Sequence, residues 1–80
     1  MSHLGEFIKL GRERKHITQK QLALHLGYRT PQYISEIECG NCYFPAGKAK
    51  KMCEFLDLNF DELLDKFAQD KKEEYLSSSI

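Results

Sequence analysis

Hydrophobic residues recur along the chain at the spacing of amphipathic helices, and no segment shows the convincing alternation of a β-strand. Leu4, Phe7, Ile8 and Gly11 lie at positions i, i+3, i+4 and i+7, which predicts a first helix over about residues 3–15. Glycine within a helix costs about 1 kcal/mol relative to alanine, so Gly11 indicates close packing of another helix at that point.

A second helix is predicted to begin after Thr18, whose hydroxyl can cap it while Gln21, three residues later, closes a capping box. Gly27 ends this helix, as glycine commonly does after a last helical turn. The apolar stripe of the helix consists of Leu22, Ala23 and Leu26.

A short turn at residues 28–30 separates the second helix from a third, which is predicted over about residues 31–38. Thr30 is expected to cap this helix, and Pro31 suits its first position. Its inward residues are Ile34 and Ile37, and the residues on or near its outer surface are Gln32, Tyr33, Ser35 and Glu36. Residues 18–38 therefore have the pattern of a helix-turn-helix, whose second helix can enter the DNA major groove.

Two further helices complete the predicted architecture. The fourth covers about residues 46–56, with an apolar repeat of Ala46, Ala49, Met52, Cys53 and Leu56. Asn59 and Glu62 form a capping signature for the fifth, whose expected inward residues are Leu63, Leu64 and Phe67. Beyond Ala68 the pattern thins, and the helix is expected to reach about Leu76 with a frayed end.

These elements predict an all-α fold, a compact bundle of about five helices. We expect a domain over residues 1–68 and a C-terminal helical extension with a frayed tail over residues 69–80. Eighty residues make one small domain, and 41% hydrophobic with 30% charged residues is ordinary for a folded globular protein.

Charge is distributed unevenly along a chain whose formal net charge is zero. Residues 9–51 carry nine lysines and arginines against three glutamates, whereas residues 52–80 carry three lysines against eight acidic residues. Such a protein can offer one basic face and one acidic face, and a basic face suits the phosphates of DNA.

The N-terminal sequence lacks the basic start and the apolar stretch of a signal peptide, and no apolar run approaches the roughly 20 residues of a membrane span. We therefore expect a cytoplasmic protein.

The chain carries three cysteines and three histidines that could act as metal ligands or catalytic groups. Cys39 and Cys42 have the spacing of a zinc-ligand pair but lack a second clear pair, and a structural zinc site needs four ligands. Cys53 lies on the apolar stripe of the fourth helix. The histidines are scattered, with no paired nucleophile and base: His3, His16 and His25. We expect reduced thiols, no metal, no cofactor and no catalysis, with redox sensing by Cys39 and Cys42 left open.

One run of residues carries a family resemblance. It reads Thr18-Gln19-x-Gln21-Leu22-Ala23, then Leu26-Gly27, then Ile34-Ser35-x-Ile37-Glu38-x-Gly40. It resembles the phage lambda repressor and Cro type of helix-turn-helix domain, the XRE family, over about residues 5–65. The resemblance implies a bacterial or phage-encoded regulator of transcription that binds double-stranded DNA.

The resemblance also implies roles for individual residues. Arg12 and Glu38 fall where the family has a structural ion pair, and Gln19 falls where it has a phosphate contact. The base-reading positions map to Arg29, Thr30, Gln32, Tyr33 and Glu36. Further phosphate contacts are expected from Lys20, Ser35, Asn41, Lys48, Lys50 and Lys51.

The chemistry of three of these side chains agrees with their implied roles, although each has a simpler alternative. A glutamine such as Gln32 can bind adenine through two hydrogen bonds, and Glu36 can accept from the cytosine amino group. Tyr33 can contact a thymine methyl or a phosphate, or it can simply pack against the fourth helix. Gln19 can equally assist the helix cap, and Glu36 can stay solvated.

The sequence departs from the commonest family pattern at three places. One extra residue lies between Gly27 and Ile34, so the base-reading register can shift by one position. Cys39 replaces a basic residue, and Pro45 comes one place late.

Two functions follow as hypotheses. The first is a dimeric repressor of a near-palindromic operator, with dimer contacts expected from Phe60, Phe67, Tyr75, Leu76 and Ile80. The second is an antitoxin-like module that uses its acidic half to bind a protein partner such as a toxin, and that can also repress its own operon.

Overall fold

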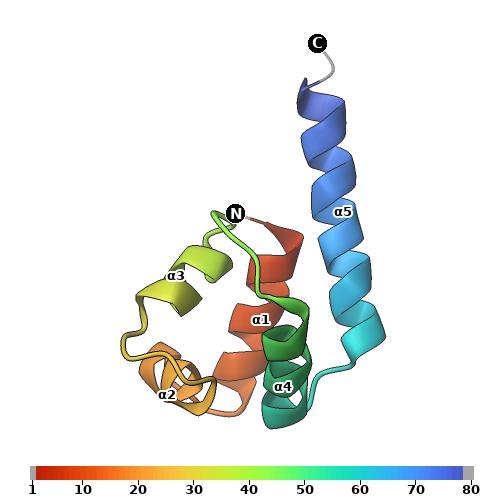
Figure 1. Ribbon diagram of the computed structural model, residues 1–80. Helices are drawn as coiled ribbons and strands as arrows, with labels where there is room; N and C mark the ends of the chain where they lie inside the picture. The colour runs from red at the N-terminus through yellow and green to blue at the C-terminus, as the bar shows by residue number, and fades with distance from the viewer. Residues whose placement is uncertain (1, 79–80) are drawn as a thin grey trace.

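The structure is a computed structural model that describes residues 2–78, and all their side chains except those of Ala46 and Ser78. Five helices follow one another in this part of the chain: α1 (His3–Arg14), α2 (Gln19–His25), α3 (Gln32–Glu38), α4 (Ala46–Leu56) and α5 (Phe60–Ser78). The described residues contain no strand, and the predicted all-α class with five helices is confirmed. Figure 1 shows α1 to α4 gathered into one body, with α5 standing along one side of it.

Short-range hydrogen bonds explain where α1, α2 and α5 begin. The Thr18 hydroxyl accepts from the Gln21 amide at 3.0 Å, and the Gln21 side chain accepts from the Thr18 amide at 2.8 Å. The Asn59 side chain accepts from the Glu62 amide at 3.1 Å. The caps predicted at Thr18 and Asn59 are therefore present. Ser2 caps α1 in the same way, through the Gly5 amide at 2.8 Å.

One hydrophobic core joins all five helices. Its fully buried large side chains are Ile8, Leu22, Leu26, Ile34, Ile37, Met52 and Leu56. Gly11 lies against Leu58, because a Cβ at Gly11 would come within 2.8 Å of both Leu58 methyl carbons. Gly11 is closely packed as expected, although its neighbour Leu58 belongs to the connection between α4 and α5 and not to a helix. Leu63 is buried as expected, whereas Leu64, which was also expected to face inward, is 46% exposed.

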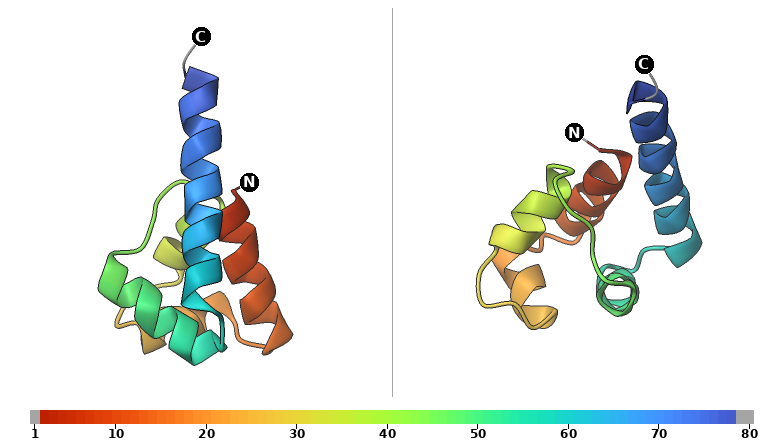
Figure 2. Two further views of the ribbon diagram at one scale, coloured as in Figure 1. Left: turned by 90° about the vertical axis from the view of Figure 1, so that its right-hand side faces the viewer. Right: turned by 45° about the horizontal axis from the view of Figure 1, so that its top comes forward.

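The last helix continues past residue 68 without a break and ends at Ser78. Figure 2 shows that its C-terminal turns rise beyond the body formed by the other helices. Among the apolar residues expected to make dimer contacts, Tyr75 and Leu76 are exposed on these turns. Ile80 lies outside the described residues.

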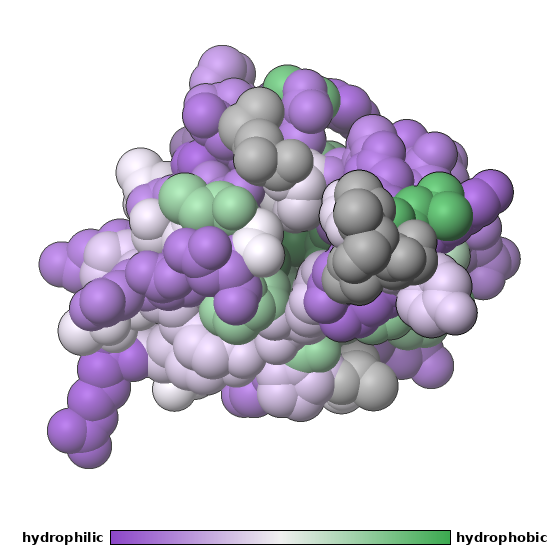
Figure 3. Space-filling model, turned by 90° about the horizontal axis from the view of Figure 1, so that it is seen from above, coloured by the Kyte–Doolittle hydropathy of each residue, from purple (hydrophilic) through white to green (hydrophobic). Residues whose placement is uncertain are grey.

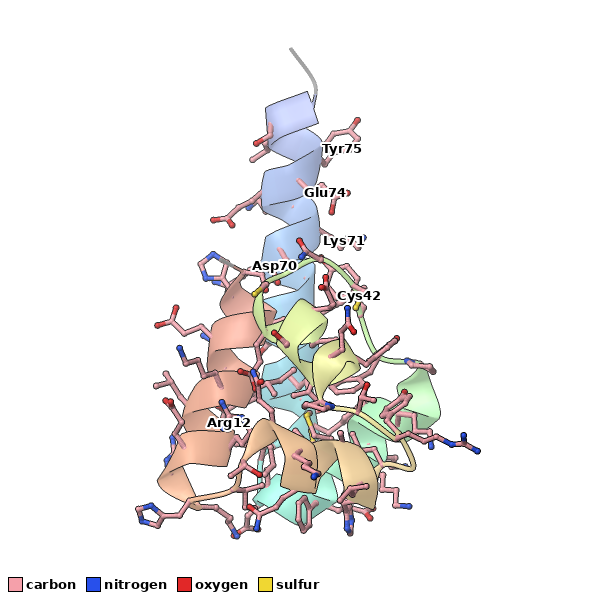
Figure 4. The ribbon with its side chains drawn as sticks, turned by 90° about the vertical axis from the view of Figure 1, so that its left-hand side faces the viewer. Arg12, Cys42, Asp70, Lys71, Glu74 and Tyr75 are labelled. Carbon is pink, nitrogen blue, oxygen red and sulfur yellow. The ribbon has the colours of Figure 1, made fainter. Side chains whose placement is uncertain are left out.

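A buried carboxylate joins this extension to the start of α1. Asp70 accepts hydrogen bonds from the backbone amides of His3 at 2.7 Å and Leu4 at 3.0 Å. One turn further along α5, Glu73 lies 3.0 Å from the His3 ring nitrogen Nε2. The labelled Asp70 lies beside the top of α1 in Figure 4.

A second contact joins α5 to the loop that follows α3. The Tyr43 ring meets the Phe67 ring edge-on, with centroids 4.8 Å apart, and the Lys71 ammonium lies 4.6 Å from the Tyr43 centroid. Such a cation over an aromatic ring contributes modestly to stability at a partly exposed site. The loop after α3 is therefore attached to α5 as well as to α4.

The end of the molecule from which the C-terminus emerges has a mostly hydrophilic surface, with hydrophobic residues in a few separate places (Figure 3). Among the helices of residues 2–78, none has the length and apolar composition that crossing a membrane requires.

Candidate nucleic-acid interface

The second and third helices form the predicted helix-turn-helix. Residues 26–31 connect them, and Gly27 has a φ of +90°, a left-handed conformation that side-chain-bearing residues rarely adopt. The Tyr28 amide donates to the Ala23 carbonyl at 2.8 Å and closes the end of α2. Gly27 therefore ends the second helix as predicted.

The start of the third helix differs from the prediction by one residue. The helix begins at Gln32, Pro31 takes the cap position, and no side chain caps it. The expectation that Thr30 caps the helix is wrong, because Pro31 has a φ of −78° and a ψ of −3° and so precedes the first helical residue as part of the turn. Thr30 and Arg29 are exposed in this turn.

One face of α3 is turned away from the core. Ile34, Ile37 and Glu38 are buried on the inner face, whereas Gln32 is exposed and Glu36 is half-buried. The turn residues Arg29 and Thr30 lie at the N-terminal end of the same helix. Four of the five residues expected to read bases, Arg29, Thr30, Gln32 and Glu36, therefore lie on α3 or directly before it with accessible surface.

Tyr33, the fifth of these residues, is already engaged within the protein. Its hydroxyl donates to the Tyr43 carbonyl at 2.9 Å. Its ring stacks on that of Tyr28 with centroids 4.8 Å apart and planes within 12° of parallel, and it lies 6.0 Å from Phe44. Tyr33 therefore packs within the protein, but against Tyr28 and the loop before α4 and not against the fourth helix as the alternative stated.

Two residues expected to make different DNA contacts are bonded to each other. The Asn41 side chain, expected at a phosphate, donates to the Glu36 carboxylate, expected at a base, with a distance of 2.8 Å. The Asn41 amide also donates to the Glu36 carbonyl at 2.9 Å. The second Glu36 carboxylate oxygen has no hydrogen bond to another described residue, so it can accept from a base.

A buried ion pair supports the helix-turn-helix from behind. Arg12 donates through Nε to Glu38 Oε2 at 2.8 Å and through Nη2 to Oε1 at 3.1 Å, while its Nη1 donates to the Ile17 carbonyl at 2.8 Å. The hydrogen bond to Glu38 raises the pKa of Arg12 above its usual value. Gln19 extends the pair by donating to Glu38 Oε1 at 3.0 Å. Figure 4 shows Arg12 on α1, reaching toward the helix-turn-helix.

The expected phosphate contacts lie in different environments. Lys20, Lys50 and Lys51 are exposed. Gln19 and Ser35 line a polar hollow between α1, α2 and α3, together with Lys9, Arg12, Glu38 and Cys39. Lys48 donates instead to the Leu26 carbonyl at the end of α2.

The cysteines stay separate, whereas one group of possible metal ligands comes together. All three thiols are free, and burial raises the pKa of Cys42 and of Cys53, which lowers their thiolate fraction.

His3, Asp70 and Glu73 bring one ligand atom each within 4.8 Å of one another. Sequence reasoning missed this group because His3 lies 67 residues from Asp70 and 70 residues from Glu73 in the chain. Asp70 and Glu73 hydrogen-bond the backbone and the His3 ring of α1, so the group forms a contact between α5 and the start of α1.

Comparisons with known proteins agree with this geometry. Residues 5–68 match the family described as "Helix-turn-helix domain". The fold is similar to the crystal structure of the clp gene regulator ClgR from Corynebacterium glutamicum, with a TM-score of 0.72 and 24% sequence identity, covering 95% of this chain and 84% of that one. No curated protein sequence matches the chain. The chain belongs to the helix-turn-helix domain family.

Proposed function

We propose that this protein represses transcription by binding a near-palindromic operator as a dimer. The observation that carries the proposal is the polar, accessible face of α3 and its preceding turn, backed by the buried pair between Arg12 and Glu38. A helix braced in this way can be presented to the major groove as a rigid unit.

In this proposal Gln32 and Glu36 read bases, and Arg29 and Thr30 act beside them at the N-terminal end of α3. Gln32 is exposed, and its side-chain amide can form two hydrogen bonds with adenine, donating one and accepting the other. Glu36 is oriented by Asn41, and its free oxygen suits the cytosine amino group.

Phosphate contacts supply attraction that does not depend on sequence. Lys20, Lys50 and Lys51 are exposed in the half of the chain that carries a local excess of positive charge. Gln19 and Ser35 border the polar hollow beside α3 and can add hydrogen bonds to the backbone of the DNA.

A dimer contact is assigned to α5. Phe60, Leu64 and Phe67 line an apolar hollow of about 210 Å³ beside α4, and Tyr75 and Leu76 are exposed further along the helix. Exposed apolar groups on a projecting helix favour burial against a second copy. Two recognition helices would then meet half-sites about one helical turn apart, which accounts for a near-palindromic operator.

Selection of bound sequences from a random double-stranded DNA library tests specificity, symmetry and spacing together. Gln32→Ala should relax the preference at one base pair and cost about 1–3 kcal/mol there, because a bidentate contact is lost. Lys50→Ala is the matched control, since loss of a phosphate contact weakens all sequences alike. Weak affinity that barely responds to salt would contradict the proposal, because phosphate contacts release counterions.

A second candidate function is an antitoxin-like role, favoured by the acidic residues 52–80 and by the exposed Tyr75 and Leu76 on α5. Here the projecting helix binds a basic protein partner, and the same chain also represses its own operon. Purification of a stoichiometric partner that Tyr75→Ser releases, with DNA binding unchanged, would favour this role over a simple repressor.

A further inference from the structure

Lys48 is directed at the helix-turn-helix connection although it belongs to α4. Its ammonium group donates to the Leu26 carbonyl at the C-terminal end of α2, and it lies 5.4 Å from the centroid of the Tyr28 ring. A Cβ added at Gly27 would lie 3.3 Å from the same nitrogen. The cation is thus enclosed by three consecutive residues of the connection.

The other side of the connection is held by aromatic rings. Tyr28 stacks on Tyr33 of α3, and Tyr33 contacts Phe44 and donates its hydroxyl to the Tyr43 carbonyl. Phe44 and Tyr43 belong to the loop that leads into α4. We refer to Tyr28, Tyr33, Phe44 and Lys48 as the turn bracket.

The turn bracket meets two physical needs of this connection. The last carbonyls of α2 have no partner within the helix, and a cation at a helix C-terminus is favoured by the helix dipole. The connection is also one residue longer than the pattern common in the resembling family, and a longer loop has more conformational freedom to restrict. The stacked rings and the Lys48 ammonium group restrict the conformation of this connection through contacts with α4 and the loop before it.

We propose that Lys48 and Tyr33 are positioning residues that set where α3 meets the DNA, and that neither is itself a DNA contact. This inference rests on the proposed function, because it explains how the base-reading face of α3 is oriented. It replaces the phosphate contact expected from the charge of Lys48 and the base-reading role that the family resemblance implies for Tyr33.

The salt dependence of DNA binding distinguishes a lysine that contacts a phosphate from a lysine that only positions α3. Lys48→Gln should leave the slope of log affinity against log salt within about 0.3 of the parent value, because no phosphate contact is removed. It should also lower the preference for the selected operator over random DNA about tenfold, since α3 is no longer held in one orientation. Lys50→Gln, an exposed lysine two residues away on the same helix, should make the slope less steep by about 0.9 and keep the preference.

A measurement on the free protein keeps the test independent of DNA. Hydrogen exchange of the Tyr28 amide should accelerate at least fivefold in Lys48→Gln and in Tyr33→Phe, and should be unchanged in Lys50→Gln. Tyr33→Phe removes only the hydroxyl donor to Tyr43 and keeps the ring stack, so it is the milder variant if Lys48→Gln lowers stability.

Two results would overturn the inference. One is a loss of salt slope in Lys48→Gln equal to that of Lys50→Gln with the operator preference retained. The other is unchanged hydrogen exchange at Tyr28 in both bracket variants. If the parent protein binds no DNA, the proposed function fails, whereas accelerated exchange would still support the bracket as a device that holds the connection.

Discussion

Two buried polar contacts attach other helices to α1, and they differ in what they hold. The pair of Arg12 and Glu38 joins α1 to α3 and lies behind the recognition face. The carboxylate of Asp70 joins α5 to the first turn of α1 through two backbone amides. The first contact unites two charged side chains, whereas the second unites a single charge with the free N–H groups of a helix start.

Because of this difference, the helix proposed to contact DNA and the helix proposed to form the dimer are each attached to α1 by a separate contact. Breaking the contact with α3 disturbs the helix that meets DNA, whereas breaking the contact with α5 disturbs the helix assigned to dimer formation. Both contacts use buried polar atoms, and within the described residues no buried side-chain nitrogen or oxygen lacks a hydrogen bond. Loss of either partner therefore leaves an unsatisfied group.

The largest effect is expected from Glu38→Ala, which leaves the Arg12 guanidinium buried without its counter-charge. The free energy of unfolding should fall by about 3–5 kcal/mol, a large part of the total for a domain of this size. Thermal unfolding followed by circular dichroism measures it. Glu54→Ala is the control on an exposed glutamate, and its effect should stay within about 0.5 kcal/mol. A loss as small as that of the control would show that the buried pair contributes little.

The next effect concerns how closely α1 approaches the end of α3. A Cβ at Gly5 would lie 2.3 Å from the Glu38 carbonyl oxygen, a backbone atom that cannot move aside cheaply. Gly5→Ala should therefore cost about 3 kcal/mol, measured by urea unfolding.

Gly47→Ala provides the matched control, because nothing lies within 4 Å of the position of its Cβ. This substitution should stabilise the protein by about 0.5 kcal/mol through helix propensity. Equal changes in the two variants would contradict a close approach at Gly5.

Asp70→Asn tests the contact with α5. The amide keeps the size of the side chain but loses the charge and one of the two acceptors for the start of α1, so the cost should be about 2 kcal/mol. Sedimentation at several concentrations should show a weaker dimer, whereas affinity for an isolated half-site should be nearly unchanged. Loss of half-site binding would show that this contact also supports α3.

The smallest effect is a dependence of stability on pH. The hydrogen bond to Glu73 raises the pKa of His3 above its usual 6.5. The contact between the two side chains is therefore fully present below pH 6.5 and is lost as the pH rises through the raised pKa. The midpoint of thermal unfolding should fall slightly over that interval, and His3→Gln should remove this part of the change. An identical pH profile in the variant would contradict the assignment to His3.

Sequence patterns predicted the elements better than the orientation of individual side chains. Periodicity and capping signatures predicted five helices, and the caps at Thr18 and Asn59 are present. The error at Thr30 is a shift of one residue in the start of α3, and the error at Leu64 assigns two neighbouring residues to the inner face where only Leu63 is buried; short-range patterns resolve neither. The DNA contacts themselves stay predictions, and the structure shows which of those side chains are accessible and which are already bonded.

By itself the sequence determined the helices, the caps at Thr18 and Asn59 and the family, because these depend on residues three or four positions apart and on one run of about 20 residues. Only the tertiary structure decided that Asp70 meets the start of α1, that Lys48 turns toward α2 and that Tyr33 is held by Tyr43. These contacts join residues that are distant in the chain or lie on different elements. Their partners are therefore set by how the helices pack on the core, and no local pattern encodes them.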